Sequence, residues 1–137
     1  MHRISYQFSY QFPSGAEGIF LPVSLQFGQE TIVIEAAVDT GASYCLFARS
    51  VGESLGINVE SGFPQIFASA GGRVEAFGHS IQLTVLGIEL DAMVFFFANG
   101  NIQKNLLGRR GWLDRVKFGL DEYQQFVYLS GPESIES

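Results

Sequence analysis

The stretch that decides the fold is Ile32-Val33-Ile34-Glu35-Ala36-Ala37-Val38-Asp39-Thr40-Gly41-Ala42-Ser43. An apolar, β-branched run leads to a single carboxylate, and Thr-Gly follows at once. Val, Ile and Thr favour strands, and glycine permits a turn where a strand ends. The pattern predicts a strand that ends at Asp39 and holds its carboxylate at the edge of the core. A carboxylate in such a place is costly unless it is hydrogen-bonded or shares its charge.

Asp-Thr-Gly is by itself also a common turn, because Asp bonds its own backbone and Gly takes positive φ. Two other segments give it more weight. Sixty-six residues after Asp39 comes Asn105-Leu106-Leu107-Gly108-Arg109, directly before a helix-like segment. Between the two lies the glycine-rich run Ala68-Ser69-Ala70-Gly71-Gly72-Arg73. Its two glycines alone indicate no more than an ordinary hairpin turn.

This ordered set of three segments resembles the retropepsin family of aspartic peptidases, over roughly residues 20 to 129. The resemblance implies an all-β fold, a retropepsin-like closed β-barrel with one or two short helices. It implies the catalytic residues Asp39, Thr40 and Gly41. The substrate-binding residues that it implies are Ala42 and the flap residues Ser69, Ala70, Gly71, Gly72 and Arg73. The structural motif that it implies consists of Asn105, Leu107, Gly108 and Arg109.

Aspartic peptidases use two facing carboxylates that share one proton and activate a water molecule. This chain has one Asp-Thr-Gly, and no other aspartate is followed by Thr-Gly or Ser-Gly. A twofold homodimer supplies the second carboxylate, because the axis places Asp39 opposite its own copy. In the family, Thr40 would bond across that axis and Gly41 would offer backbone groups to substrate. The expected partners are therefore a second copy and a peptide or unfolded protein.

Two departures from the family pattern affect the dimer more than the fold. Viral members often carry an acid at the position of Ser43, which pairs with the motif arginine. Arg109 must therefore find another partner here. The viral dimer is also knitted by a sheet of chain termini, whereas residues 117–129 look able to close as their own hairpin.

The remaining chain divides into an N-terminal strand or arm (1–18), the retropepsin-like domain (19–129) and a polar tail (130–137). Aromatic residues alternate with polar ones over residues 1–12, which indicates a strand. Further expected elements are strands at 19–27, 31–38, 79–85 and 88–97, a flap hairpin at 63–78, and short helices at 49–56 and 110–116. The run 93–97 is too apolar for a one-sided strand, so both of its faces should be covered.

Composition limits the function classes. The chain has 137 residues, enough for one domain with a core, and a formal charge of −6. That charge argues against a nucleic-acid partner, which needs a basic face. The longest apolar run has seven residues, far short of a bilayer span, and no signal peptide is apparent, so no membrane association is expected.

Two reactive residue types have simple interpretations. Cys45 is the single cysteine, which fits a reducing compartment and a cytoplasmic location. We interpret it as a small buried hydrophobe rather than a nucleophile. His79 has no second ligand at a useful spacing, so a solvent-facing or hydrogen-bonded histidine is the better interpretation. No metal and no cofactor are expected.

Two alternatives to a peptidase remain. The same fold could serve as a non-catalytic peptide-binding dimer module, because a fold does not fix a function. The chain could also be a monomeric β domain in which Asp39 merely caps a turn. A monomer at high concentration would exclude the shared carboxylate pair.

Overall fold

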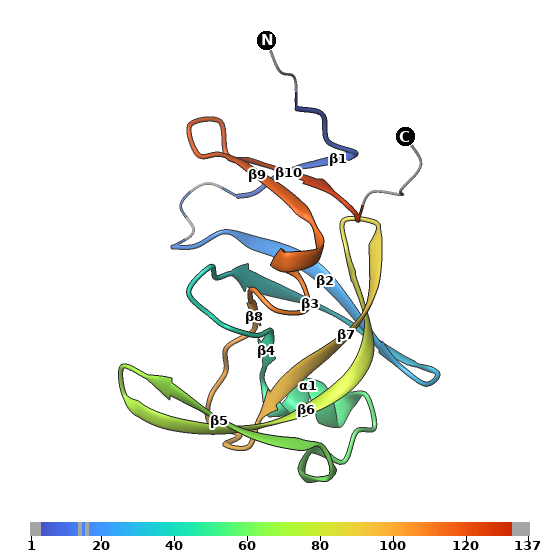
Figure 1. Ribbon diagram of the computed structural model, residues 1–137, viewed down its shortest axis with the longest axis vertical. Helices are drawn as coiled ribbons and strands as arrows, with labels where there is room; N and C mark the ends of the chain where they lie inside the picture. The colour runs from blue at the N-terminus through green and yellow to red at the C-terminus, as the bar shows by residue number, and fades with distance from the viewer. Residues whose placement is uncertain (1–3, 14, 16, 133–137) are drawn as a thin grey trace.

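The computed structural model describes residues 4–13, 15 and 17–132. These residues form an all-β fold with one short α-helix, α1 (Arg49–Ser54) (Figure 1). The strands are β1 (Phe8–Gln11), β2 (Phe20–Phe27), β3 (Glu30–Val38), β4 (Leu46–Phe47), β5 (Phe63–Ser69), β6 (Gly72–Val85), β7 (Ile88–Phe97), β8 (Leu106–Leu107), β9 (Lys117–Asp121) and β10 (Phe126–Ser130). Two single-turn 3-10 helices complete it, η1 (Val59–Ser61) and η2 (Leu113–Arg115).

The larger sheet has seven strands in the order β2-β3-β8-β4-β7-β6-β5. Strand β2 also pairs with β6, from Val23↔Val85 to Gln26↔Gln82, so the sheet closes on itself. β5 lies outside this ring and pairs only with β6, as the outer arm of a long hairpin. The expected closed β-barrel is therefore confirmed, although β4 and β8 contribute only two residues each.

Alternation along the strands builds the core. On β2 the side chains of Leu21, Val23 and Leu25 are buried, and the intervening residues are not fully buried. On β7 the prediction that both faces are covered holds from Val94 to Phe97 and is wrong for Met93, which is 44% exposed. The outer face of the sheet is therefore open at Met93 but covered nearer the end of the strand.

The smaller sheet has three strands in the order β1-β10-β9 and lies at the end of the molecule opposite the β5–β6 hairpin (Figure 1). β9 and β10 pair as an antiparallel hairpin, which confirms the closing hairpin expected at 117–129. β1 adds to β10 with Phe8 opposite Leu129, so the N-terminal arm is bound to the C-terminal hairpin of its own chain. Residues 1–3 of the expected arm and 133–137 of the expected tail lie outside the described residues.

The two expected helices differ in outcome. α1 forms as predicted, with Leu55 buried after it and Gly56 at φ 78° ending it. The helix expected at 110–116 is wrong in length, because only the 3-10 turn η2 forms. Gly111 adopts φ 97°, outside the helical region, and donates its N–H to Asp114 Oδ1 at 3.0 Å. No helix of the described residues is long and apolar enough to cross a membrane.

Candidate active site

Strand β3 ends at Val38, and the chain turns at once through Asp39. The Gly41 N–H donates to Asp39 Oδ1 at 2.9 Å, and the Ala42 N–H donates to the Asp39 carbonyl at 3.2 Å. Asp39 is partly buried, whereas Thr40 and Gly41 are exposed. The turn therefore holds the carboxylate in a fixed position and leaves Thr40 at the surface.

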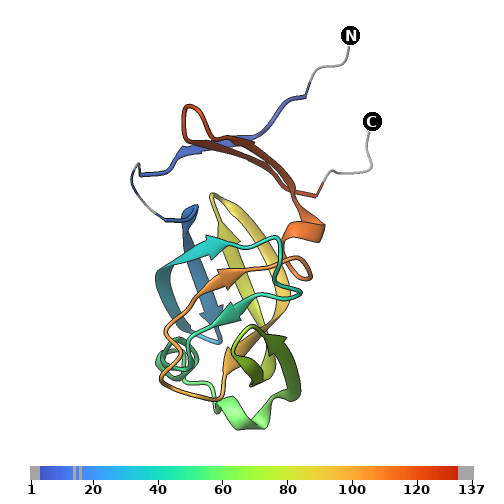
Figure 2. The same cartoon turned by 90° about the vertical axis from the view of Figure 1, so that its left-hand side faces the viewer.

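The segment that contains β8 holds the Asp39 turn through backbone hydrogen bonds. Strand β8 lies between β3 and β4, and Figure 2 shows its orange arrow between the two arrows of cyan to teal colour. The Asp39 N–H donates to the Leu107 carbonyl at 2.9 Å, and the Ala37 N–H donates to the Asn105 carbonyl at 2.9 Å. The Asn105 side chain accepts the Ala48 N–H at 2.9 Å, so it also joins this segment to the start of α1.

Gly108 packs directly against the backbone of Ala42 and Tyr44. A Cβ at this position would lie 2.1 Å from the carbonyl oxygen of Tyr44, a backbone atom that cannot rotate away. On its C-terminal side, the Arg109 N–H donates to the Ala42 carbonyl at 2.9 Å. The structure thus brings the Asp39 turn and the segment around Gly108 into direct contact. The two backbones can approach this closely only because residue 108 is glycine.

A hollow of about 740 Å³ lies beside the Asp39 turn. Its walls come from the Asp39 turn, the flap hairpin and the loop before β8. The apolar side chains that line it are Leu46, Phe67, Val74, Phe97, Ile102 and Leu106. Asp39 is the single carboxylate among its described lining residues. The site is therefore an apolar groove with one acid at its edge.

The β5–β6 hairpin, which is the expected flap, differs in detail from the prediction. Ser69 pairs with Gly72, so the turn consists of Ala70 and Gly71, and Gly72 begins β6 at φ 123°. Gly71 and Ala68 line the hollow. The turn is therefore one residue earlier than the expected Gly71-Gly72 tip.

Phe67 and Val74 form the inner face of the flap, and the sequence analysis missed them as site residues. They pair across the hairpin and pack on a buried cluster that includes Phe95. The next pair, Ala68 and Arg73, carries its side chains on the other face, because neighbouring residues of a strand alternate. Alternation within 63–69 was the signal that could have identified Phe67.

Tyr44 connects the base of the flap to the motif arginines. Its ring meets those of Phe67 and Phe95 edge-on, with centroids 5.8 and 4.9 Å away. Arg110 donates to the Tyr44 hydroxyl at 3.2 Å and lies 5.5 Å from its ring centroid. Arg109 is exposed, and its side chain has no hydrogen bond or ion pair with any described residue. The arginine that makes a side-chain contact near Ser43 is therefore Arg110, through Tyr44, and not Arg109.

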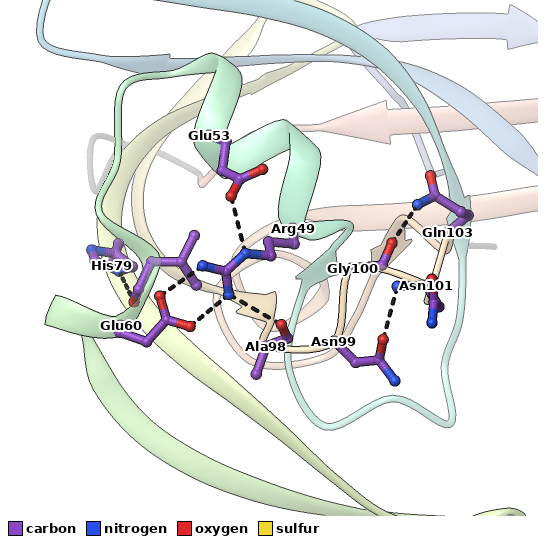
Figure 3. Close-up of polar contacts among 10 residues, drawn as sticks. Arg49, Glu53, Glu60, His79, Ala98, Asn99, Gly100, Asn101 and Gln103 are labelled. Carbon is purple, nitrogen blue, oxygen red and sulfur yellow. Dashed lines mark hydrogen bonds and ion pairs between the residues drawn. The ribbon is translucent and has the colours of Figure 1, made fainter.

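The loop from Ala98 to Lys104 forms one wall of the hollow, and Arg49 braces it (Figure 3). The guanidinium of Arg49 donates to the Ala98 carbonyl at 3.0 Å and pairs with Glu60 at 2.6 and 2.7 Å. It also bonds Glu53 at 3.0 Å. Glu60 first and Glu53 next raise the pKa of Arg49, and Arg49 lowers the pKa of Glu60.

Within the same loop, two side chains stabilise the chain path (Figure 3). The Asn101 N–H donates to Asn99 Oδ1 at 2.8 Å, and Gln103 Nε2 donates to the Gly100 carbonyl at 2.8 Å. The wall is therefore held both internally and by Arg49.

Cys45 and His79 have structural roles. Cys45 is fully buried, and burial raises the pKa of its thiol to about 11, although the Gly108 N–H points at its Sγ from 3.4 Å. His79 Nε2 donates to the Val59 carbonyl at 2.9 Å. Both interpretations from the sequence are confirmed. No group of three or more His, Cys, Asp or Glu within 4–13, 15 and 17–132 is placed to hold a metal ion.

Comparisons with known proteins agree with this geometry. The family model described as "Aspartyl protease" matches residues 21–110. A retropepsin-like aspartic protease from Rickettsia conorii matches the structure with a TM-score of 0.65 and 18% identity, over 91% of this chain and 98% of that one. The EIAV protease, in complex with the inhibitor HBY-793, matches with a TM-score of 0.55 and 17% identity, over 71% and 86% of the two chains. A sequence search of curated proteins found no match.

Proposed function

The chain belongs to the aspartyl protease family, and we propose that two copies of it form one peptide-cleaving site around Asp39 and its symmetry mate. The observation that carries this proposal is the lone carboxylate at the edge of an apolar groove. The reaction requires a second carboxylate that faces Asp39. A twofold axis provides it, because the axis places Asp39 of the second copy there.

The chemistry follows from the proximity of two like charges. Carboxylates about 3 Å apart cannot both ionise, so one keeps a proton and the pair titrates as a unit. The ionised member removes a proton from a water molecule held between them, and that water attacks the peptide carbonyl. The protonated member donates a hydrogen bond to the carbonyl oxygen as negative charge develops there. A proton of the aspartate pair then passes to the nitrogen of the leaving amine.

The local bonds around Asp39 suit this role. The Gly41 N–H already bonds one carboxylate oxygen, which orients the group and leaves the other oxygen for its partner. The Thr40 side chain is exposed at the turn, where a second copy would approach. We assign to Thr40 the bond across the axis that the family pattern implies.

The substrate would be an extended peptide of a flexible or unfolded protein. The apolar lining of the groove favours apolar side chains next to the cleaved bond. Strand β5 has a free outer edge, since it pairs only with β6, and the flap turn lies beside the groove. An extended peptide can use such edges and backbone groups as an added strand.

The dimer would differ from one built on interleaved termini. In this chain β1 already pairs with β10, so the terminal strands satisfy one another within one copy. The contacts between copies would then come from the exposed surface around the Asp39 turn. We expect such a dimer to be weaker than one knitted by a shared sheet.

The test compares the parent chain with Asp39→Asn on an unfolded protein substrate, from about pH 3 to about pH 7. Asn keeps the shape of Asp but cannot share the proton, so fragments should appear with the parent and not with the variant. Cleavage by both would place the activity elsewhere. Cleavage by neither, with a stable dimer in solution, would favour a peptide-binding module.

A further inference from the structure

The positive charges of this acidic chain are unevenly distributed. It has 8 Lys and Arg against 14 Asp and Glu. Four of the eight lie on elements that build the site, namely Arg73, Lys104, Arg109 and Arg110. The chemistry of the two aspartates uses none of these four cations, in a protein with a net charge of −6.

Lys104 is the basic residue with a direct position in the groove. It lines the main hollow together with Asp39. It also lines a second hollow of about 480 Å³, which shares Asp39, Gln103 and Leu106 with the first. Both hollows therefore open next to the reacting carboxylate, with Lys104 in the wall of each.

The ammonium group of Lys104 has no partner among the described residues. Its side chain is exposed, and it makes no ion pair or hydrogen bond with any described residue. Glu35 lines the second hollow as well, but it is not paired with Lys104 among the residues described. The three N–H donors of Lys104 are thus available to a ligand in the groove.

The other three cations are less suitable. Arg73 stands on the opposite face of the flap from Phe67 and Val74. Arg110 is held against Tyr44. Arg109 lies outside the residues that line either hollow. This comparison leaves Lys104 as the cation that a bound peptide would meet first.

We propose that Lys104 selects peptides with an acidic side chain close to the cleaved bond; the inference rests on the proposed function, since it names the substrate class of the same groove. The acidic side chain bonds the ammonium while neighbouring apolar side chains cover the groove lining. A charge-assisted bond is stronger when a bound peptide excludes water. In a twofold dimer, one copy of Lys104 lies on each side of the cleaved bond, so an acid is accepted on either side.

The wall that carries Lys104 is well supported. Arg49 bonds the Ala98 carbonyl at its beginning, and Gln103 bonds the Gly100 carbonyl next to Lys104. A lysine on a braced loop loses less conformational entropy on binding than one on a loose loop. More of the interaction energy with the ligand then remains in the binding free energy.

The test measures peptide binding, so that it does not depend on turnover. The Asp39→Asn protein is titrated with fluorescent apolar peptides that carry either Glu or Gln at one position, scanned along the peptide. At about pH 7, where Glu is charged, we expect the Glu peptide to bind about tenfold more tightly at one or two positions. Added salt should reduce this preference.

Substitutions assign the preference to the residue. Lys104→Gln should remove the difference between the two peptides, and Lys104→Glu should reverse it. Lys117→Gln is the matched control, because it removes the same charge at a place that lines neither hollow of the groove. It should keep the preference for the Glu peptide.

Three results would overturn the inference: equal binding of both peptides at every position, a preference that survives Lys104→Gln, or no binding of either peptide. Failure of the proposed function has a different signature. In that case the Glu preference and its dependence on Lys104 would be measured, but the parent protein would cleave neither peptide.

Discussion

The Asp39 turn and the tip of the flap face the same hollow but are built in opposite ways. The turn is bonded on several sides by backbone groups of Leu107, Arg109 and its own Gly41. The flap turn of Ala70 and Gly71 belongs to a hairpin whose outer strand, β5, pairs with β6 alone. In the proposed function, the Asp39 turn is the floor of the groove and the hairpin is its lid.

The difference suits the roles that the proposed function gives to the two regions. A reacting carboxylate must be held within a fraction of an ångström, so its neighbours are backbone groups that cannot rotate away. A lid over a peptide groove must open, and exposed hairpins with few buried contacts open at low cost. The same residue change should therefore have very different consequences in the two regions.

Glycine to alanine is the most direct comparison. Gly108→Ala places a methyl group against the Tyr44 carbonyl, whereas Gly71→Ala meets nothing within 4 Å. We expect Gly108→Ala to lower the free energy of unfolding by about 3 kcal/mol or more, and Gly71→Ala to change it by less than about 0.5 kcal/mol. Urea unfolding of both variants measures the two values.

Equal effects in the two variants would contradict the distinction between floor and lid. A folded Gly108→Ala protein with unchanged stability would mean that residues 42–45 can move away from residues 108–110, and the turn would not be fixed as described.

Two phenylalanines of β5 compare a packed position of the hairpin with an exposed one. Phe67 packs edge-on against Tyr44 and Phe95, whereas Phe63 is 59% exposed. Phe67→Ala should cost about 2 kcal/mol, because it removes partly buried aromatic contacts. Phe63→Ala should stay within about 0.5 kcal/mol. Thermal unfolding in parallel gives the comparison, and a larger loss in Phe63→Ala would show that the contacts of Phe67 do not hold the hairpin in place.

The smallest expected effect lies in the groove wall and depends on pH. Arg49 lowers the pKa of Glu60 below its usual 4.5, so the folded protein favours the charged carboxylate. The resulting stabilisation is present above that usual value and is lost as the pH falls through the lower folded value. Glu60→Gln should therefore give a slightly lower Tm than the parent at about pH 7 and the same Tm at about pH 2. A difference that grows with acid would contradict the sign.

The sequence predicted the floor better than the lid. The apolar strand that stops at Asp39 and the later Leu107-Gly108 pair are local and specific signals, because few structures accommodate both of them. The direct contact of Gly108 with Tyr44 agrees with this pattern. In the hairpin, the two adjacent glycines predicted a tip at Gly71-Gly72, which is one residue later than the turn that forms. The face of the hairpin that meets the groove depends on the pairing of Phe67 with Val74, which required the structure.

Elements outside the motifs were harder to predict for a physical reason. The helix expected at 110–116 does not form in full, because Gly111 adopts a positive φ and a bond to Asp114 replaces the first helical turn. The pairing of β1 with β10 joins residues more than 110 positions apart. Alternation predicts that such strands exist, but it does not specify their partners.

The central proposal, that two copies share one pair of aspartates, is tested most directly by mixing. Inactive Asp39→Asn chain is added to a fixed amount of parent, at concentrations where sedimentation shows dimers, and cleavage is followed after subunit exchange. If each site needs Asp39 from both copies, an equal amount of variant should reduce cleavage to about half, because mixed dimers withdraw parent chains from active pairs. Unchanged cleavage would mean that each chain carries a complete site, and it would contradict the shared pair.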